Sequence, residues 1–305
     1  MACSLLSKSE MRSLIVTVAL LTFPGILFAQ DRNILRLGQE LQSPDLGVRR
    51  QAAIGLGRVS QPQSVRLLQQ ALANEQSASI RLELVRALRN IAFLRYPGYR
   101  EALQALGNAA NEAFEPDLNV RLRATQALWE AGKKDLLNPV PFLDRNLDDS
   151  SQRLRLASVQ MLRKLGTPAT IPPLGRAAND KAQPETIRLR AIEALGAVSL
   201  AEGGVVGRAI AATNIAVANR LGREPIMPAA ALEKRHEQQI RFLGAVLQDP
   251  DNSSTLALRA VKSVGQVKDK SSVPILQQVA TTHGDAAVRS QALRAISHVL
   301  ARQYE

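Results

Sequence analysis

The sequence predicts an all-α protein, an α-solenoid of about eight stacked helix pairs. Three observations lead to this prediction. A ten-residue motif recurs seven times, with most copies 32 to 40 residues apart. Its apolar and small residues follow the spacing of one face of an α-helix. Only 3% of the residues are aromatic, which is typical of thin layers of aliphatic side chains rather than one wide core.

The motif begins with an aliphatic residue, which we number position 0. Arg follows at position 1, and apolar or small residues recur at positions 4, 7, 8 and 11. The seven copies start at Val48, Ile80, Val120, Leu154, Ile187, Leu256 and Val288. The fifth and sixth starts are 69 residues apart, about two periods, so we expect one copy to be lost or distorted between them.

Each copy is predicted to be the second helix of a pair. Three positions before most copies stands a residue whose side-chain oxygen can cap the first free amides of the helix; these are Asp45, Ser77, Asp117, Ser151, Ser253 and Asp285. Shorter amphipathic stretches are predicted to be the first helices, over residues 34–41, 64–72, 101–114, 140–147, 171–178 and 273–280. One pair cannot bury its apolar face alone, so neighbouring pairs must stack.

The motif resembles a HEAT repeat, and its short period is similar to the HEAT-like repeats of the phycobilisome lyase family. The resemblance covers residues 31–305 with one interruption. It implies a solenoid that presents a curved surface to protein partners, with the second helix of each pair on the concave side.

The first residues are typical of an export signal. Residues 13–30 carry no charge, follow Lys8 and Arg12, and contain an acceptable cleavage site ending at Ala29. We expect residues 1–29 to be a signal peptide that directs the chain to the periplasm or out of the cell. The alternative is a membrane anchor over residues 13–30, for which the segment is barely long enough.

The rest of the chain is predicted to hold repeats over residues 30–198, an irregular segment over 199–232 and repeats over 233–305. Either Met1 or Met11 can be the initiator. Cleavage of the signal would remove Cys3, the only cysteine, so the mature chain would have no thiol chemistry.

Arginine stands at position 1 in six of the seven copies: Arg49, Arg81, Arg121, Arg155, Arg188 and Arg289. On a helical wheel this position lies inside the apolar arc. We expect the stem to pack between layers and the guanidinium to bind the capping Asp of a neighbouring turn or loop carbonyls. The alternative is a ladder of anion-binding arginines. The structural interpretation is favoured because a residue repeated in every layer belongs to the layer.

The net charge of +12 overstates the charge offered to a partner. Without residues 1–29, which carry Lys8, Arg12 and Glu10, the charge is +11, and without the six arginines at position 1 it is +5. Positions 3, 6 and 10 form the solvent arc of the second helices. Among them are eight cations, Arg58, Arg86, Arg123, Lys164, Arg190, Arg259, Lys262 and Arg294, and three anions, Glu83, Glu130 and Glu193.

These eight cations, named here the cationic row, are the candidate partner-binding residues. If they line the concave side, they form a mildly basic groove suited to an acidic protein segment or another polyanion. The alternative is an ordinary solvated helix face.

Three local departures from the repeat are further candidates for a partner contact. Trp129, the only tryptophan, stands at position 9, where most copies have a small residue, and is either a filler or an interface anchor. Tyr96 and Tyr99 lie in a turn that is either a longer loop or an exposed contact. Residues 199–232 break the repeat, and their glycines lack the Lys-Ser/Thr of a phosphate loop.

The sequence offers little for catalysis. His236, His283 and His298 lie far apart in the repeat register, and none has a companion at metal-ligand spacing. We therefore predict no catalytic residue, no metal site and no cofactor.

We interpret the chain as an exported, non-enzymatic scaffold that binds a protein partner. One alternative is a bilin-lyase-like protein, which the family resemblance implies but no chromophore-handling motif supports. The other is a solenoid that binds nucleic acid or another polyanion, which is disfavoured because the cationic row has no aromatic residues for base stacking. The sequence specifies neither the partner nor the oligomeric state, and it indicates membrane contact only through the signal or anchor.

Overall fold

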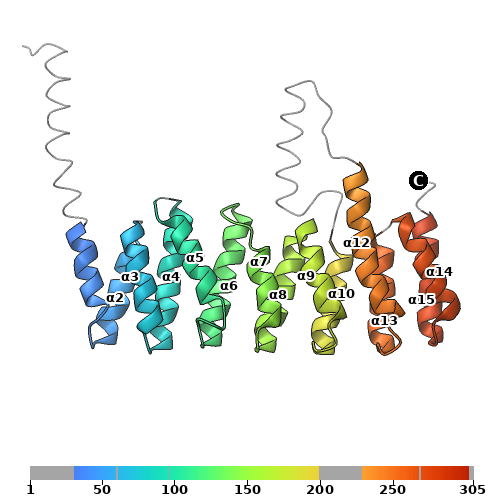
Figure 1. Ribbon diagram of the computed structural model, residues 1–305, viewed down its shortest axis with the longest axis horizontal. Coiled ribbons are helices and arrows are strands. Elements are labelled where there is room, and N and C mark those ends of the chain that lie inside the picture. The colour runs from blue at the N-terminus through green and yellow to red at the C-terminus, as the bar shows by residue number, and fades with distance from the viewer. Residues whose placement is uncertain (1–30, 60, 96, 199–228, 268, 302–305) are drawn as a thin grey trace, which may run out of the picture. The chain divides into compact units, whose positions relative to one another are not determined.

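The computed structural model describes residues 31–59, 61–95, 97–198, 229–267 and 269–301, with backbone alone for 229–235 (Figure 1). The predicted signal peptide, most of the irregular segment 199–232 and Tyr96 lie outside the described residues. The described residues contain fourteen α-helices and no strand. The predicted all-α solenoid is therefore confirmed.

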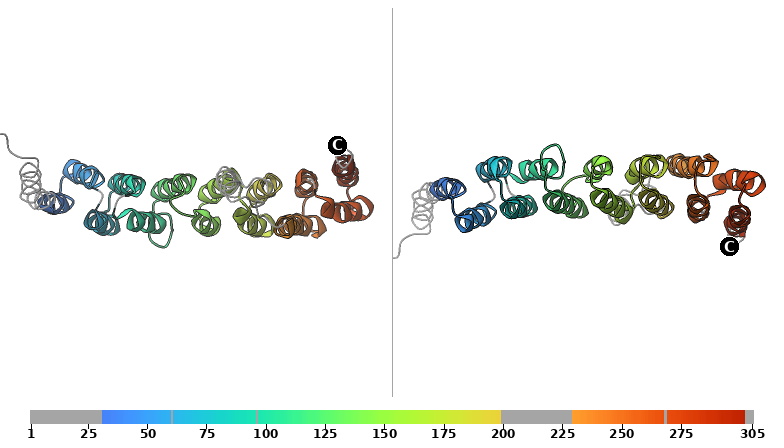
Figure 2. Two further views of the ribbon diagram at one scale, coloured as in Figure 1. Left: turned by 90° about the horizontal axis from the view of Figure 1, so that it is seen from above. Right: turned by 90° about the horizontal axis from the view of Figure 1, so that it is seen from below.

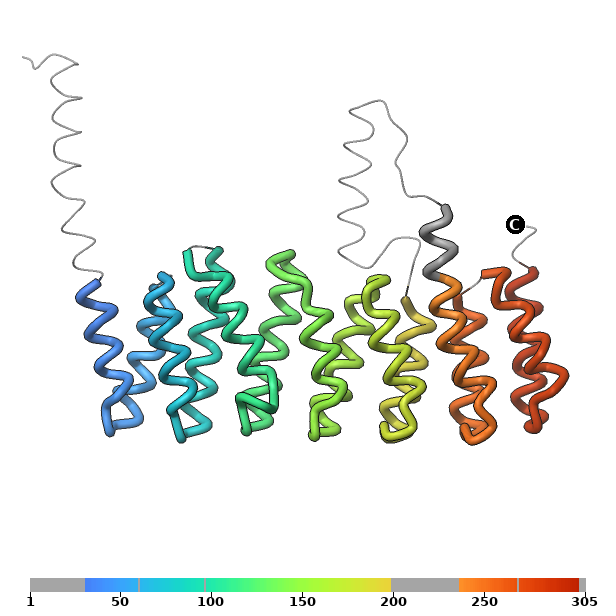
Figure 3. The backbone as a smooth tube through the Cα atoms, viewed as in Figure 1, coloured from blue at the N-terminus to red at the C-terminus, as the bar shows by residue number. Residues whose placement is uncertain are grey.

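The chain forms two compact units, Met1–Leu106 and Gly107–Glu305. The first contains a helix over residues 31–40, α2 (Leu46–Leu56), α3 (Pro62–Asn74) and α4 (Ala78–Leu94), and α5 (Tyr99–Ala109) crosses into the second. The second continues with α6 (Leu118–Lys133), α7 (Val140–Arg145), α8 (Gln152–Leu165), α9 (Ile171–Asn179) and α10 (Glu185–Gly196), then α12 (Ala229–Gln248), α13 (Ser254–Val267), α14 (Val273–Thr282) and α15 (Ala286–Ala301). Figure 3 shows that successive helices within a unit run antiparallel.

Within each unit the helices form two layers, as the views along the helix axes show (Figure 2). Second helices pack on second helices, α2 on α4 in the first unit and α6, α8, α10, α13 and α15 in succession in the second. First helices pack in the same way, as α9 does on α12. Because α10 contacts α13 directly, the 69-residue interval adds no layer between them, and the described residues form seven helix pairs.

The core between the two layers is built from aliphatic residues. The aliphatic side chain at position 0 is buried in every copy after the first, position 4 is buried in all seven copies, and position 8 is buried in the first six. The largest fully buried side chains in the described residues are all Leu or Ile. Branched aliphatic side chains suffice because each layer is one helix thick, which accounts for the low aromatic content.

One predicted helix end and two of the six predicted caps were wrong. The helix expected over residues 101–114 ends at Ala109, because the Asn111 side chain accepts a hydrogen bond from the amide of Ala113 and closes a turn. Four of the six expected caps form, at Asp45, Asp117, Ser253 and Asp285.

Ser77 and Ser151 make no side-chain cap. The hydroxyl of Ser77 bonds that of Ser79 instead.

Glycine at position 9 sets the closest approach of consecutive second helices. Gly57 faces Ala87, Gly196 faces Ser263 and Gly265 faces Ala295, and each partner stands at position 7 of the following copy. A Cβ on Gly196 would lie 2.6 Å from the Ser263 Cβ, so a larger residue there would force α10 and α13 apart.

We predict that Gly196→Val destabilises the second unit by about 1–3 kcal/mol, because the added methyl groups overlap α13. Urea unfolding followed by circular dichroism measures the change. Gly284→Val is the matched control, since no atom lies within 4 Å of a Cβ at Gly284. Equal destabilisation by the two substitutions would contradict close packing at Gly196.

Candidate partner-binding site

The arginines at position 1 bind the turn that precedes their own helix. In Arg49, Arg81, Arg121, Arg155 and Arg289, Nη1 donates to the carbonyl oxygens six and five residues earlier, at 2.6–3.2 Å. Arg188 differs and donates from Nε to the Ala178 carbonyl at 3.1 Å. Each of these guanidinium groups therefore links its helix by hydrogen bonds to the segment that precedes the helix.

In Arg49 and Arg121 the other edge of the guanidinium reaches a carboxylate of the next copy. Arg49 donates from Nε and Nη2 to Glu75 at 2.8 and 3.1 Å. Arg121 Nε lies 3.0 Å from Asp149 Oδ2, and Nη2 donates to Oδ1 at 3.1 Å. The Arg121 and Asp149 side chains are only 4% and 3% exposed. Breaking such a pair would leave an uncompensated charge inside the stack.

The carboxylate partner is not the capping residue that the sequence suggested. Glu75 and Asp149 stand two residues before Ser77 and Ser151 and accept the amides of those residues. The capping residues Asp45 and Asp117 instead accept amides of their own helices. An acid two residues before the cap is better placed to pair with the arginine of the preceding copy, because its backbone carbonyl is held by a hydrogen bond from the arginine of its own copy.

Burial alone would raise the pKa of the Glu75 carboxyl. The hydrogen bonds from Arg49 and the Ser77 amide, with the Arg49 charge, lower this pKa on balance below its ordinary value. A carboxyl whose pKa is lower in the folded than in the unfolded state stabilises the fold at pH values above the pKa of the unfolded state. That contribution is lost as the pH falls through the folded pKa.

The cationic row lies on the outer side of the second helices, and carboxylates neutralise part of it. In the first unit Arg86 pairs with Glu83 at 2.5 Å. In the second unit Arg190 and Arg259 both pair with Glu193, at 2.9 and 2.6 Å. Within the part of the chain that the structure describes, the remaining five cations have no carboxylate partner; they are Arg58, Arg123, Lys164, Lys262 and Arg294.

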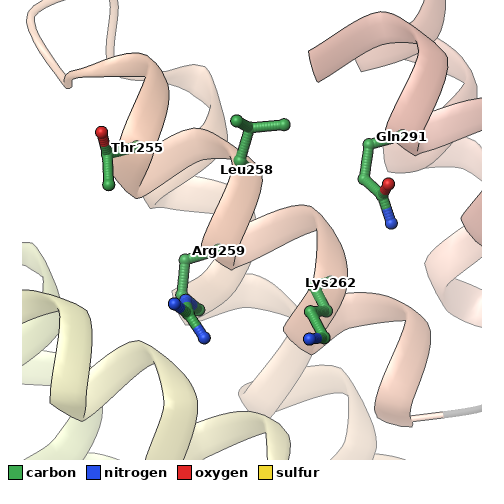
Figure 4. Close-up of a pocket in the computed structure, with 5 residues that line it drawn as sticks. All are labelled: Thr255, Leu258, Arg259, Lys262 and Gln291. Atoms are coloured by element: carbon green, nitrogen blue, oxygen red, sulfur yellow. The ribbon is translucent and has the colours of Figure 1, made fainter. Parts of the chain in front are cut away.

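Two grooves of the second unit are lined by this row. One, of about 490 Å³, lies between α8 and α10 and is lined by Val159, Gln160, Arg163, Lys164 and Arg190. The other lies between α13 and α15 as two adjoining hollows of about 410 and 360 Å³ that share Lys262 and Gln291. Figure 4 shows Thr255, Leu258, Arg259 and Lys262 along one helix and Gln291 on the neighbouring helix.

The structure adds residues that the sequence did not single out. Arg163 lines the α8–α10 groove from position 9, and Arg294 is joined in the α13–α15 groove by His298 at position 10. Arg163 could have been identified from the sequence, because it is a charged residue at position 9, where glycine recurs.

Trp129 packs against the core of the second unit and is half-buried. Two lysines lie over its ring, Lys133 at 4.6 Å and Lys164 at 5.5 Å from the centroid. The indole therefore fills the junction between α6 and α8 and also positions Lys164, which lines the α8–α10 groove. Tyr99 begins α5, and its hydroxyl accepts a hydrogen bond from Arg100 Nε at 3.0 Å.

Among the described residues no three or more His, Cys, Asp or Glu side chains gather into a group that could hold a metal ion. Within the same ranges, no helix has the length and hydropathy needed to span a bilayer.

A family model described as HEAT repeats matches residues 34–116 and 111–196, more than half of the chain. The chain belongs to the HEAT-repeat family. This match confirms the predicted resemblance. A search of curated proteins finds no match to the chain.

Several solved structures have a similar fold. The X-ray structure of the Escherichia coli protein YibA is 13% identical over 88% of this chain and 82% of that chain, with a TM-score of 0.42. Human deoxyhypusine hydroxylase is 19% identical over 92% and 100%, with a TM-score of 0.37. The complex of CpcE and CpcF of phycocyanin lyase from Nostoc is 19% identical over 87% and 93%, with a TM-score of 0.36.

We predict that Arg121→Leu lowers the unfolding free energy by about 3–5 kcal/mol, because Asp149 would remain buried without its partner. Thermal or urea unfolding measures the loss. Arg163→Leu is the control, since Arg163 is exposed and we expect a change within about 0.5 kcal/mol. An unchanged melting temperature for Arg121→Leu would show that the pair does not hold the layers.

Proposed function

We propose that this HEAT-repeat protein is a non-enzymatic scaffold that binds an acidic segment of a protein partner along the second helices of its second unit. The HEAT-repeat solenoid fold is consistent with a role as a protein-interaction scaffold. The observation that carries the proposal is the pair of grooves lined by unneutralised cations, Lys164 with Arg163 on one side and Lys262 with Arg294 on the other.

The charge pattern between the grooves specifies the ligand further. Glu193 pairs with both Arg190 and Arg259 at the contact of α10 with α13, so the cations without a carboxylate partner are divided into two clusters. The α8–α10 and α13–α15 grooves are two helix spacings apart, or about 16–20 Å at ~8–10 Å per packed helix. An extended peptide covers this distance in about five or six residues at ~3.3 Å each. The fitting ligand has two acidic clusters separated by about that number of residues.

A protein segment fits these grooves better than a nucleic acid. Single strands combine an unbroken phosphate backbone with bases that stack on aromatic side chains. The described residues that line the grooves include no Phe, Tyr or Trp, and Glu193 would face the backbone between the two clusters.

We also propose that the chain is exported and acts in the periplasm or outside the cell. The uncharged stretch 13–30 after Lys8 and Arg12 supports this. Mass spectrometry of protein recovered from the expressing bacterium should find a mature form that begins at Gln30. A form that retains residues 13–29 would support the membrane-anchored alternative instead.

We predict that a peptide with two Asp/Glu clusters six residues apart binds the full chain, with affinity that falls as salt rises, because the free cations provide the attraction. Fluorescence anisotropy of the labelled peptide measures the dissociation constant. The double variant Lys164→Glu/Lys262→Glu should weaken binding at least tenfold, about 1.4 kcal/mol.

Arg145→Glu/Arg241→Glu, with both substitutions on exposed positions of first helices (α7 and α12), is the charge-matched control and should change binding little. A peptide with its acidic clusters adjacent tests the spacing and should bind more weakly. The proposal would be contradicted by binding that neither charge reversal nor salt affects, or by a single-stranded oligonucleotide that binds more tightly than the peptide.

A further inference from the structure

Helix α15 exposes a face that the corresponding helices bury. Position 5 is buried in the other six copies, as at Val159 and Val261, yet Leu293 at this position of α15 is 57% exposed. Leu300, two turns further along the same face, is 41% exposed, whereas Ala92 at its position in α4 is fully buried. Within each unit the next second helix packs against the one before it, as α4 does on α2 and α15 on α13.

Arg289 gives the same face a specific polar group. Its Nη1 binds the carbonyls of His283 and Gly284, as the other arginines bind their own turns. The edge formed by Nε and Nη2, which in Arg49 and Arg121 binds an acid of the next copy, has no partner among the described residues. Arg188 uses this edge too, since its Nη2 donates to Asn252 at 2.5 Å.

We infer that this α15 face docks a helix pair of a partner protein. The partner's turn carries an Asp or Glu two residues before the helix cap, which pairs with Arg289. Its second helix is apolar on the side that covers Leu293 and Leu300. This face presents two exposed leucines and a guanidinium edge that matches a carboxylate.

A second copy of this chain is a poorer occupant. The first copy of the motif has Ser43 at the place of Glu75 and Asp149. The Ser43 hydroxyl accepts the Asp45 amide at 3.2 Å, and the Ser43 carbonyl accepts from Arg49. No carboxylate is present there for Arg289, so the charge complementarity favours another protein. This face is separate from the cationic row, and the inference does not depend on the proposed function.

A chain with one more repeat tests the inference. In the repeat register Ala301 of α15 corresponds to Lys133 of α6, so a second copy of residues 134–166, carrying α7, α8 and Asp149, replaces residues 302–305 without a change of register. We expect the added residues to resist hydrogen exchange and to raise the melting temperature.

Three substitutions separate specific docking from unspecific contact. Arg289→Gln, or Asp149→Asn in the added copy alone, should lower the melting temperature by similar amounts, and the two together should add no further loss. Leu293→Glu should remove the protection of the added pair while leaving the melting temperature of the unextended chain unchanged.

Three results would overturn the inference. The added residues could exchange as an unfolded chain does, or their protection could be independent of Arg289 and Leu293. Analytical ultracentrifugation of the unextended chain should show a monomer; a dimer that Leu293→Glu dissolves would assign the face to self-association instead.

Discussion

The structure depends on one interaction that recurs along the stack, between the arginine at position 1 and two successive turns. Arg121 illustrates it, since one edge of its guanidinium binds the carbonyls of Glu115 and Pro116 and the other binds the carboxylate of Asp149 in the next copy. Asp149 in turn accepts from Arg155 through its carbonyl. Burial of both charges costs desolvation energy that good geometry offsets, so removal of either partner destabilises the stack by leaving the other charge buried alone.

This constraint separates the structural cations from those that a partner can reach. The arginines at position 1 direct their charge into the turns, while positions 3, 6 and 10 stay on the surface of the second helices. Where position 9 is glycine, as at Gly196, consecutive second helices approach closely. Grooves lie beside Arg163 at position 9 between α8 and α10, and beside Gly265 at position 9 between α13 and α15. The grooves therefore depend on the side chains around them and not on position 9 alone.

The repeated pattern allowed the helix pairs, the HEAT-repeat family and the surface position of the cationic row to be predicted. It did not allow the partner of the arginine ladder to be predicted, because Glu75 and Asp149 lie in turns outside the motif and their role depends on the neighbouring copy. The direct packing of α10 on α13 could not be read from the 69-residue spacing either, since chain separation does not determine which layers touch. Nor does helical periodicity show which surface positions face a carboxylate such as Glu193.

The central claim is that the arginine and the acid of adjacent copies stabilise the stack together, and a double-mutant cycle at Arg49 and Glu75 tests it in the unit where the pair is less deeply buried. The measurement compares the urea-unfolding free energies of the parent chain, Arg49→Leu, Glu75→Gln and the double variant at neutral pH. We predict that the loss in the double variant is smaller than the sum of the single losses by about 1–3 kcal/mol, the coupling typical of contacting residues in one network. Losses that add to within about 0.5 kcal/mol would show that the two side chains act independently and would contradict the account.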